Sequence, residues 1–131
     1  MNRMAVTRSR PHRWVLVVED EQLMRRLLEK VISNQGTPVL LAADGEEAIE
    51  IYRRYKEEIS VVLLDLGLPK ISGSEVFKLM REENPYVRVV VASGYLEPEV
   101  KSKMRDAGVE HFIEKPYLLD KVIATLQSLM R

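Results

Sequence analysis

The strand-like segments of this sequence end in side chains that can bind a metal ion or a phosphate. The five residues concerned are Glu19, Asp20, Asp65, Ser93 and Lys115. Short segments rich in β-branched residues are typical of buried strands, and ligands bind at the carboxyl ends of the strands of an open parallel sheet. We therefore expect three carboxylates, one hydroxyl and one amine to lie together at one edge of a sheet. This combination suits a divalent metal ion beside a transferable phosphoryl group.

The three carboxylates predict a magnesium site. Mg²⁺ prefers oxygen ligands and is commonly held by one or two carboxylates together with water and phosphate oxygens. Crowded carboxylates repel one another, so a bound cation would keep all three ionised. Each acid also has an ordinary explanation, because Glu19 and Asp20 could be a charged strand end that caps a helix, and Asp65 a turn residue. The recurrence of polar residues at further strand ends favours a site.

The same residues could transfer a phosphoryl group. A carboxylate such as Asp65 can attack phosphorus and form an acyl phosphate. The oxygens of the transferring group need neutralisation, which Mg²⁺, the ammonium group of Lys115 and the hydroxyl of Ser93 can supply. Alternatively, Lys115 is a solvated loop residue and the Ser93 hydroxyl bonds to the backbone. Each alternative is adequate by itself, but the whole set is hard to explain without an anion.

Five strand-like segments alternate with five helical patterns from Trp14 onwards. The strands are expected at about 14–19, 38–43, 60–65, 87–93 and 110–114, and four of the helices at about 21–34, 73–83, 97–107 and 118–130. The remaining helix follows Asp44, which together with Glu47 resembles a capping box. Such βα units predict an α/β fold in which helices cover both faces of a parallel sheet.

The length and charge of the chain limit its domain organisation and its partners. A chain of 131 residues suits one domain, which we assign to residues 14–131. Residues 1–13 contain four arginines and no acid, so they are expected to form a basic, disordered leader. The remainder then has 16 of the 20 basic residues against all 20 acidic ones. This mildly acidic domain argues against direct binding of nucleic acid.

The sequence contains no cysteine and no long apolar segment. A disulfide framework and a thiolate metal site are therefore excluded, and the composition fits a reducing compartment. No apolar run reaches the roughly 18 residues that a transmembrane helix needs. We therefore expect a cytoplasmic protein that does not bind membranes.

Four motifs make the chain similar to the receiver domain of two-component response regulators, the CheY-like family. In the order and spacing of the family, the motifs are VVEDE at 17–21, LLDLGLPKISG at 63–73, VVVASGY at 89–95 and FIEKPY at 112–117. The resemblance covers residues 14–131. It implies a doubly wound (βα)5 flavodoxin-like fold, with a five-stranded parallel sheet in the order 2-1-3-4-5.

The resemblance also implies a role for each site residue. Asp65 would be the phosphoacceptor, and Ser93 and Lys115 would bind the phosphoryl group. Mg²⁺ would be held directly by Asp20, Asp65 and the backbone carbonyl of Gly67, and by Glu19 through water. Mg²⁺ would be the cofactor. The implied function is that of a receiver domain in a phosphorelay, which takes a phosphoryl group from a phosphohistidine donor. Such a domain is a signalling phosphoacceptor rather than an enzyme.

A second set of residues would transmit the phosphorylated state to the surface. Ser93 and Phe112 match the switch positions of the family, and Phe112 also suits plain core packing. The bond between Lys115 and Pro116 would be a cis peptide bond. The surface that changes would be formed by the predicted helix at 97–107, the strand at 110–114 and the helix at 118–130.

The expected partner is a sensor histidine kinase or a histidine phosphotransferase. The predicted helix at 21–34 carries two apolar stripes, and we predict that Met24 and Leu28 partly face outward and dock this donor. The alternative is that both are core residues, because a core-facing helix normally carries a wide apolar face. We expect a monomer or a weak, phosphorylation-dependent dimer.

Two positions in the motifs bear on the fate of the phosphoryl group. Gly67, two residues after Asp65, has no side chain to orient water, and Tyr95, two residues after Ser93, is a bulky ring. We expect slow self-dephosphorylation for this reason. An aspartyl-phosphate phosphohydrolase of the haloacid-dehalogenase kind is an alternative, but it normally needs an acid where Gly67 stands. A second alternative is a degenerate receiver that is never phosphorylated. The intact acids and Lys115 argue against this alternative.

Overall fold

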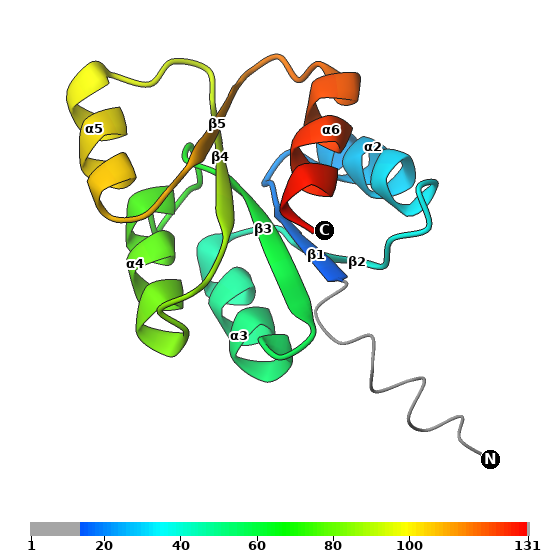
Figure 1. Ribbon diagram of the computed structural model, residues 1–131, viewed down its shortest axis with the longest axis horizontal. Coiled ribbons are helices and arrows are strands. Elements are labelled where there is room, and N and C mark those ends of the chain that lie inside the picture. The colour runs from blue at the N-terminus through cyan, green and yellow to red at the C-terminus, as the bar shows by residue number, and fades with distance from the viewer. Residues whose placement is uncertain (1–13, 131) are drawn as a thin grey trace.

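The computed structural model describes residues 14–130 and contains one five-stranded parallel sheet between two layers of helices (Figure 1). The strands are β1 (Trp14–Val18), β2 (Val39–Ala42), β3 (Ile59–Asp65), β4 (Val89–Ser93) and β5 (His111–Glu114). The helices are α2 (Gln22–Ser33), α3 (Gly45–Tyr55), α4 (Gly73–Glu83), α5 (Pro98–Asp106) and α6 (Leu119–Leu129). The strand order β2-β1-β3-β4-β5 confirms the predicted doubly wound fold. The leader predicted at 1–13 lies outside the described residues.

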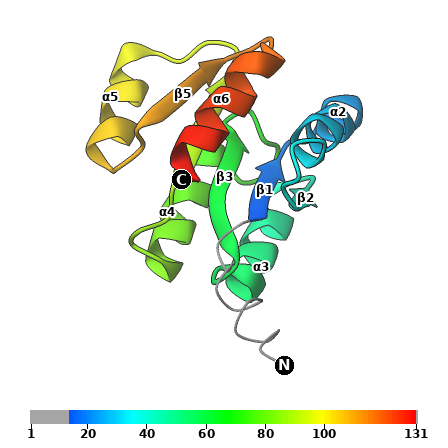
Figure 2. The same cartoon turned by 45° about the vertical axis from the view of Figure 1, so that its right-hand side comes forward.

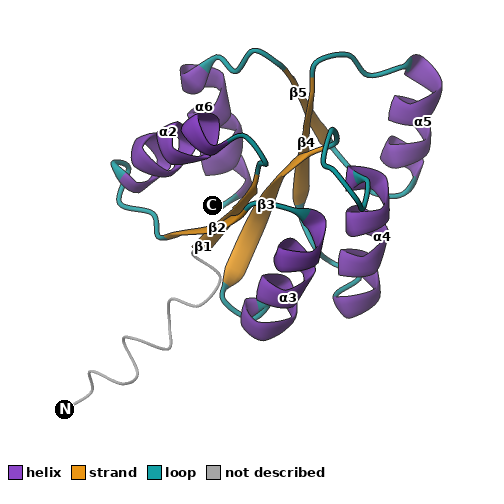
Figure 3. Ribbon diagram, turned by 180° about the vertical axis from the view of Figure 1, so that it is seen from behind, coloured by secondary structure: helices purple, strands orange, loops and turns teal. Residues whose placement is uncertain are grey.

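The helices divide between the two faces of the sheet. Helices α2 and α6 cover one face, and α3, α4 and α5 cover the other (Figures 1 and 3). Side chains along a strand alternate between the faces, so Val15 and Val17 join the core under α2 and α6, whereas Leu16 and Val18 join the core under the other three helices. Strands β1, β3 and β4 are buried on both faces, which explains their continuous apolar sequences.

Helices α3 and α4 begin at residues whose side chains satisfy free backbone groups. Asp44 accepts a hydrogen bond from the Glu47 N–H (2.8 Å), as the predicted capping box requires, whereas the Glu47 carboxylate accepts one from the Ala43 N–H (2.6 Å), one residue before the cap. The Ser72 hydroxyl accepts a bond from the Glu75 N–H (3.2 Å). These caps fix the ends of the loops that follow β2 and β3 at the carboxyl edge of the sheet.

The loop between β3 and α4 is held close to the end of β3. A Cβ atom at Gly73 would lie 2.7 Å from the Cα atom of Leu66 and 2.8 Å from the carbonyl oxygen of Asp65. Only glycine fits this approach without displacing the backbone. The loop is therefore pinned beside Asp65, and the backbone of Gly67 lies next to that carboxylate.

Strands β2 and β4 are each two residues shorter than predicted, and the backbone explains why each begins late. The strand expected at 87–93 begins at Val89, because the N–H of Val87 donates to the Asn84 carbonyl in a turn (3.1 Å). Strand β2 begins after Pro38, which has no N–H to donate to a neighbouring strand. Both late starts lie at the opposite edge of the sheet from the predicted site. None of the helices within residues 14–130 is long and apolar enough to cross a bilayer.

Candidate functional site

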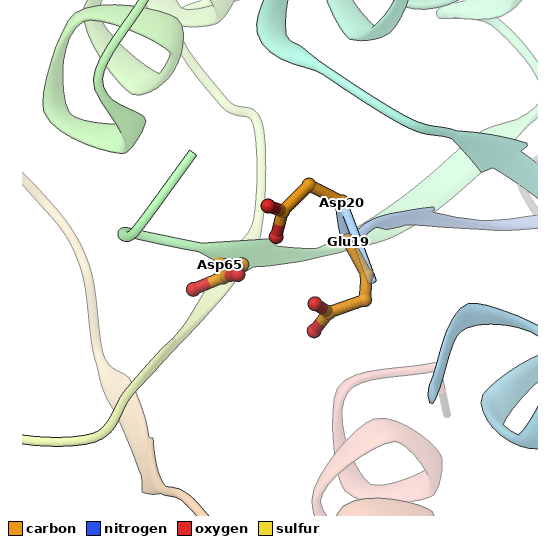
Figure 4. A group of neighbouring side chains, drawn as sticks. All are labelled: Glu19, Asp20 and Asp65. Atoms are coloured by element: carbon orange, nitrogen blue, oxygen red, sulfur yellow. The ribbon is translucent and has the colours of Figure 1, made fainter. Parts of the chain in front are cut away.

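Three carboxylates meet at the carboxyl edge of the sheet. Strands β1 and β3 are parallel neighbours (Figure 2). Val18 on β1 pairs with Leu64 on β3, so the residues that follow, Glu19 and Asp65, come side by side. One carboxylate oxygen each of Glu19, Asp20 and Asp65 lies within 4.8 Å of the other two (Figure 4). Glu19 and Asp65 are buried, whereas Asp20 is exposed. The structure therefore brings the three predicted acids together, with one open side.

Both carboxylate oxygens of Asp65 have a partner. Its Oδ1 accepts a hydrogen bond from the Gly67 N–H (2.9 Å), and its Oδ2 lies 3.0 Å from the Nζ atom of Lys115. Lys115 follows the end of β5, and its backbone N–H donates to the Ser93 carbonyl on β4 (2.8 Å). Because β4 lies between β3 and β5, this bond fixes the point from which the lysine reaches Asp65.

Glu19 is also buried and shares Lys115 with Asp65. Its Oε1 lies 3.2 Å from the Lys115 Nζ, and its Oε2 accepts a hydrogen bond from the Glu21 N–H (3.2 Å). Burial raises the pKa of the Glu19 carboxyl, and the charge of Asp65 raises it further; the bond from Glu21 and the charge of Lys115 offset only part of this increase. The raised pKa of Glu19 therefore reflects its burial first and the neighbouring Asp65 carboxylate second.

Lys115 acts as a fixed positive charge between two carboxylates. Burial alone would lower the pKa of its ammonium group, but the hydrogen bonds and charges of Asp65 and Glu19 outweigh burial and raise the pKa. The Lys115–Pro116 peptide bond is cis, as predicted. The possible metal ligands of the site are the carboxylate oxygens of Glu19, Asp20 and Asp65, which are hard ligands of the kind that Mg²⁺ prefers. These residues therefore fit a magnesium ion.

Two residues that sequence analysis did not assign to the site also contact it. The hydroxyl of Tyr117 donates to Oε1 of Glu19 (3.2 Å). Arg25 donates from Nη1 to the carbonyl oxygens of Glu19 (2.8 Å) and Asp20 (3.3 Å), and so ties α2 to the loop that carries both acids. The position of Arg25, about one helical turn after the acidic pair, could have predicted this contact from the sequence. Tyr117 lies within the FIEKPY motif, but no spacing rule gives the direction of its side chain.

Ser93 and Phe112 occupy their predicted positions without touching the carboxylates. The Ser93 hydroxyl donates to the Tyr95 carbonyl (2.9 Å), and within residues 14–130 it makes no hydrogen bond to the three acids. Phe112 is half-buried against the core under α3, α4 and α5. The centre of its ring lies 5.3 Å from the Nζ atom of Lys101 and 5.6 Å from the guanidinium carbon of Arg105. Both residues of the predicted switch are thus half-buried, and the Ser93 hydroxyl bonds to the loop that follows β4.

The outward face of α2 differs from the prediction. Leu28 is completely buried together with Ile32, and the half-buried Met24 packs against the same core. Leu23 and Leu27 are instead exposed, by 77% and 41%. Residues four apart share one face of a helix, so the stripe at 24, 28 and 32 faces the sheet and the stripe one residue earlier faces outward. The prediction that Leu28 partly faces outward is therefore wrong.

Comparison with known protein families agrees with this geometry. The family model described as the response regulator receiver domain matches residues 15–127. The chain belongs to the response regulator receiver family. Receiver domains are signalling phosphoacceptors that bind Mg²⁺ at acidic residues and interact with histidine kinases or phosphotransferases. The predicted resemblance is thus confirmed, and the acidic cluster has the composition that the family uses.

Individual known proteins are similar to most of this chain. A cyclic di-GMP phosphodiesterase of Thermotoga maritima is 35% identical over 106 residues, which are 81% of this chain and 28% of the relative. The probable transcriptional regulatory protein TcrX of Mycobacterium tuberculosis is 32% identical over 117 residues, 89% of this chain and 49% of that protein. The chain thus spans about half, or less, of the length of these two relatives. In the crystal structure of the CheX-CheY-BeF3-Mg+2 complex from Borrelia burgdorferi, a chain matches with a TM-score of 0.84 and 28% identity, covering 90% of this chain and 89% of that chain.

Proposed function

We propose that this receiver domain accepts a phosphoryl group from a phosphohistidine donor onto Asp65, as one step of a two-component phosphorelay. The observation that carries the proposal is the setting of the Asp65 carboxylate. It is buried, oriented by the Gly67 N–H and paired with Lys115, beside two further carboxylates. A carboxylate held in one orientation next to positive charge is well placed to act as a nucleophile on phosphorus.

In the proposed reaction, a carboxylate oxygen of Asp65 attacks the phosphorus atom of phosphohistidine. A P–O bond forms, the P–N bond breaks, and the imidazole leaves with the electron pair of that bond and takes up a proton. The product is an acyl phosphate on Asp65. The Lys115 ammonium group, 3.0 Å from Oδ2 of Asp65, can follow the negative charge onto a phosphoryl oxygen.

Mg²⁺ is the proposed cofactor. Asp20, Asp65 and the backbone carbonyl of Gly67 would hold the ion, and Glu19 would act through water. Carboxylate oxygens that lie within 4.8 Å of one another support this assignment. When bound, the ion would neutralise charge on the phosphoryl oxygens during transfer.

Phosphorylation would change the surface formed by α5, β5 and α6. The Ser93 hydroxyl, which now bonds to the Tyr95 carbonyl, would turn to the phosphoryl group and leave space for Phe112 to move inward. Lys101 and Arg105 lie over the Phe112 ring, so this movement would release two cations at the surface. A phosphoryl group thereby alters both the shape and the charge that a downstream partner meets.

The proposed donor is a sensor histidine kinase or a histidine phosphotransferase that docks on α2. Leu23 and Leu27 are exposed beside Met24, and α2 begins at Gln22, two residues after Asp20. A partner on this face therefore reaches the open side of the acidic cluster. Leu28 is not part of the docking face.

We further propose that residues 14–131 act in the cytoplasm as a monomer or a weak, phosphorylation-dependent dimer. Direct binding of nucleic acid or membranes is not part of this function. Because the domain would turn over no metabolite, its only chemistry would be its own phosphorylation and dephosphorylation.

Incubation with a phosphorylated histidine phosphotransferase and Mg²⁺ tests the proposed function. We expect intact mass spectrometry to show one added phosphoryl group on the wild-type chain and none on Asp65→Asn. If neither this donor nor acetyl phosphate labels the wild type, the chain is a degenerate receiver and the proposal fails. Continuous release of phosphate from many equivalents of donor would instead indicate a phosphohydrolase.

A further inference from the structure

The hydroxyl of Tyr117 reaches the same carboxylate oxygen as Lys115. Oε1 of Glu19 lies 3.2 Å from the Tyr117 hydroxyl and 3.2 Å from the Lys115 Nζ. The Glu19 side chain is only 2% exposed, and its Oε2 accepts the Glu21 N–H. This buried carboxylate thus has three donors, and only Lys115 also pairs with Asp65.

Lys115 has to change partners if a phosphoryl group arrives on Asp65. It would turn from the two carboxylates to a phosphoryl oxygen, and Glu19 would lose one donor. A buried carboxylate that loses a donor is destabilised, because its negative charge is then less well compensated. The free energy needed to move the Lys115 ammonium group away from Glu19 therefore depends on the hydrogen-bond donors that remain on this carboxylate.

We propose that Tyr117 is a positioning residue that allows Lys115 to leave Glu19 and meet the phosphoryl group. Its hydroxyl stays on Oε1 when the ammonium group departs, so Glu19 remains paired. The inference rests on the proposed function, because Lys115 moves only if a phosphoryl group reaches Asp65. It assigns to Tyr117 a part in the chemistry that the sequence did not indicate.

Two further observations fit this role. The Tyr117 phenol is protonated at neutral pH, so it remains a donor to Glu19. The Lys115 Nζ also lies 5.5 Å from the centre of the Tyr117 ring, which keeps the ammonium group close by a cation–π interaction. The ring and the hydroxyl thus act on different groups, and they can be separated by substitution.

Tyr117→Phe removes the hydroxyl and keeps the ring. In this variant Lys115 is the only side-chain donor on Glu19 among the described residues, so it is held there more tightly. We expect calorimetric affinity for beryllium trifluoride with Mg²⁺, a mimic of the phosphoryl group, to fall about tenfold, as expected for loss of one hydrogen bond to a charged group. Tyr86→Phe is the matched control, because Tyr86 is 87% exposed, and it should bind as the wild type does.

A double-mutant cycle distinguishes this role from simple support of the local structure. In a Lys115→Met background no ammonium group has to leave Glu19, so Tyr117→Phe should change the affinity by less than about twofold. An equal loss in both backgrounds, or an unchanged affinity of Tyr117→Phe alone, overturns the proposal. If the wild type itself does not bind beryllium trifluoride with Mg²⁺, the proposed function fails and the inference fails with it.

Discussion

Replacement of Lys115 by methionine would show how much the site depends on the ammonium group that pairs with both Glu19 and Asp65. Methionine keeps much of the length of the side chain and removes the ammonium group, which lies 3.0 Å from Asp65 and 3.2 Å from Glu19. Loss of one partner from a buried ion pair costs about 3–5 kcal/mol. Because the Lys115 side chain is 27% exposed, solvent screens part of this interaction, and we expect the free energy of unfolding without Mg²⁺ to fall by about 2 kcal/mol.

Urea unfolding of both proteins, with and without saturating Mg²⁺, measures this effect. The bound ion supplies the missing positive charge, so the difference between wild type and variant should shrink to less than about 1 kcal/mol. Mg²⁺ should also bind the variant more tightly, because it no longer shares the carboxylates with an ammonium group. Lys78→Met, at an exposed position of α4, is the control and should leave stability unchanged. Equal stability without Mg²⁺, or an equal loss under both conditions, would refute this reasoning.

Three further predictions concern Glu19, Tyr95 and α2. Glu19→Gln should stabilise the Mg²⁺-free protein at neutral pH. Burial raises the pKa of the Glu19 carboxyl above its ordinary value of 4.5, so ionisation of this group opposes folding at higher pH. The gain in the free energy of unfolding, measured in urea, should disappear below pH 4.5, and a gain that persists there would have another cause. Tyr95→Ala should shorten the lifetime of the acyl phosphate severalfold if the ring shields it, and equal decay rates would remove the idea. Leu27→Glu should slow phosphoryl transfer from a phosphohistidine protein about tenfold and leave the rate of phosphorylation by acetyl phosphate unchanged. If both rates are unchanged, the donor does not dock on this face of α2.

The acidic cluster could be predicted because it depends on few geometric facts. Glu19 follows β1 and Asp65 ends β3, and the pairing of these neighbouring strands brings the two acids together whatever the details of packing. The fold could be predicted for a similar reason. Continuous apolar strands that alternate with amphipathic helices allow few arrangements other than a parallel sheet covered on both faces.

The contacts that could not be predicted depend on side-chain direction. Leu27 and Leu28 are both apolar and adjacent, so the sequence does not show which of them faces the sheet; the packing of α2 against the shared core decides it. The Ser93 hydroxyl bonds to a carbonyl in the following loop, and the loop path is not encoded in a spacing rule. Tyr117 reaches Glu19 across 98 positions of sequence, and only the assembled sheet brings the two together.

The central claim is that Asp65 forms an acyl phosphate that depends on Mg²⁺. The most direct measurement treats the protein with acetyl phosphate, reduces the acyl phosphate with borohydride and locates the resulting homoserine by peptide mass spectrometry. We predict homoserine at position 65 alone, and only when Mg²⁺ is present. Modification at another residue, equal modification without Mg²⁺, or no modification at all would contradict it.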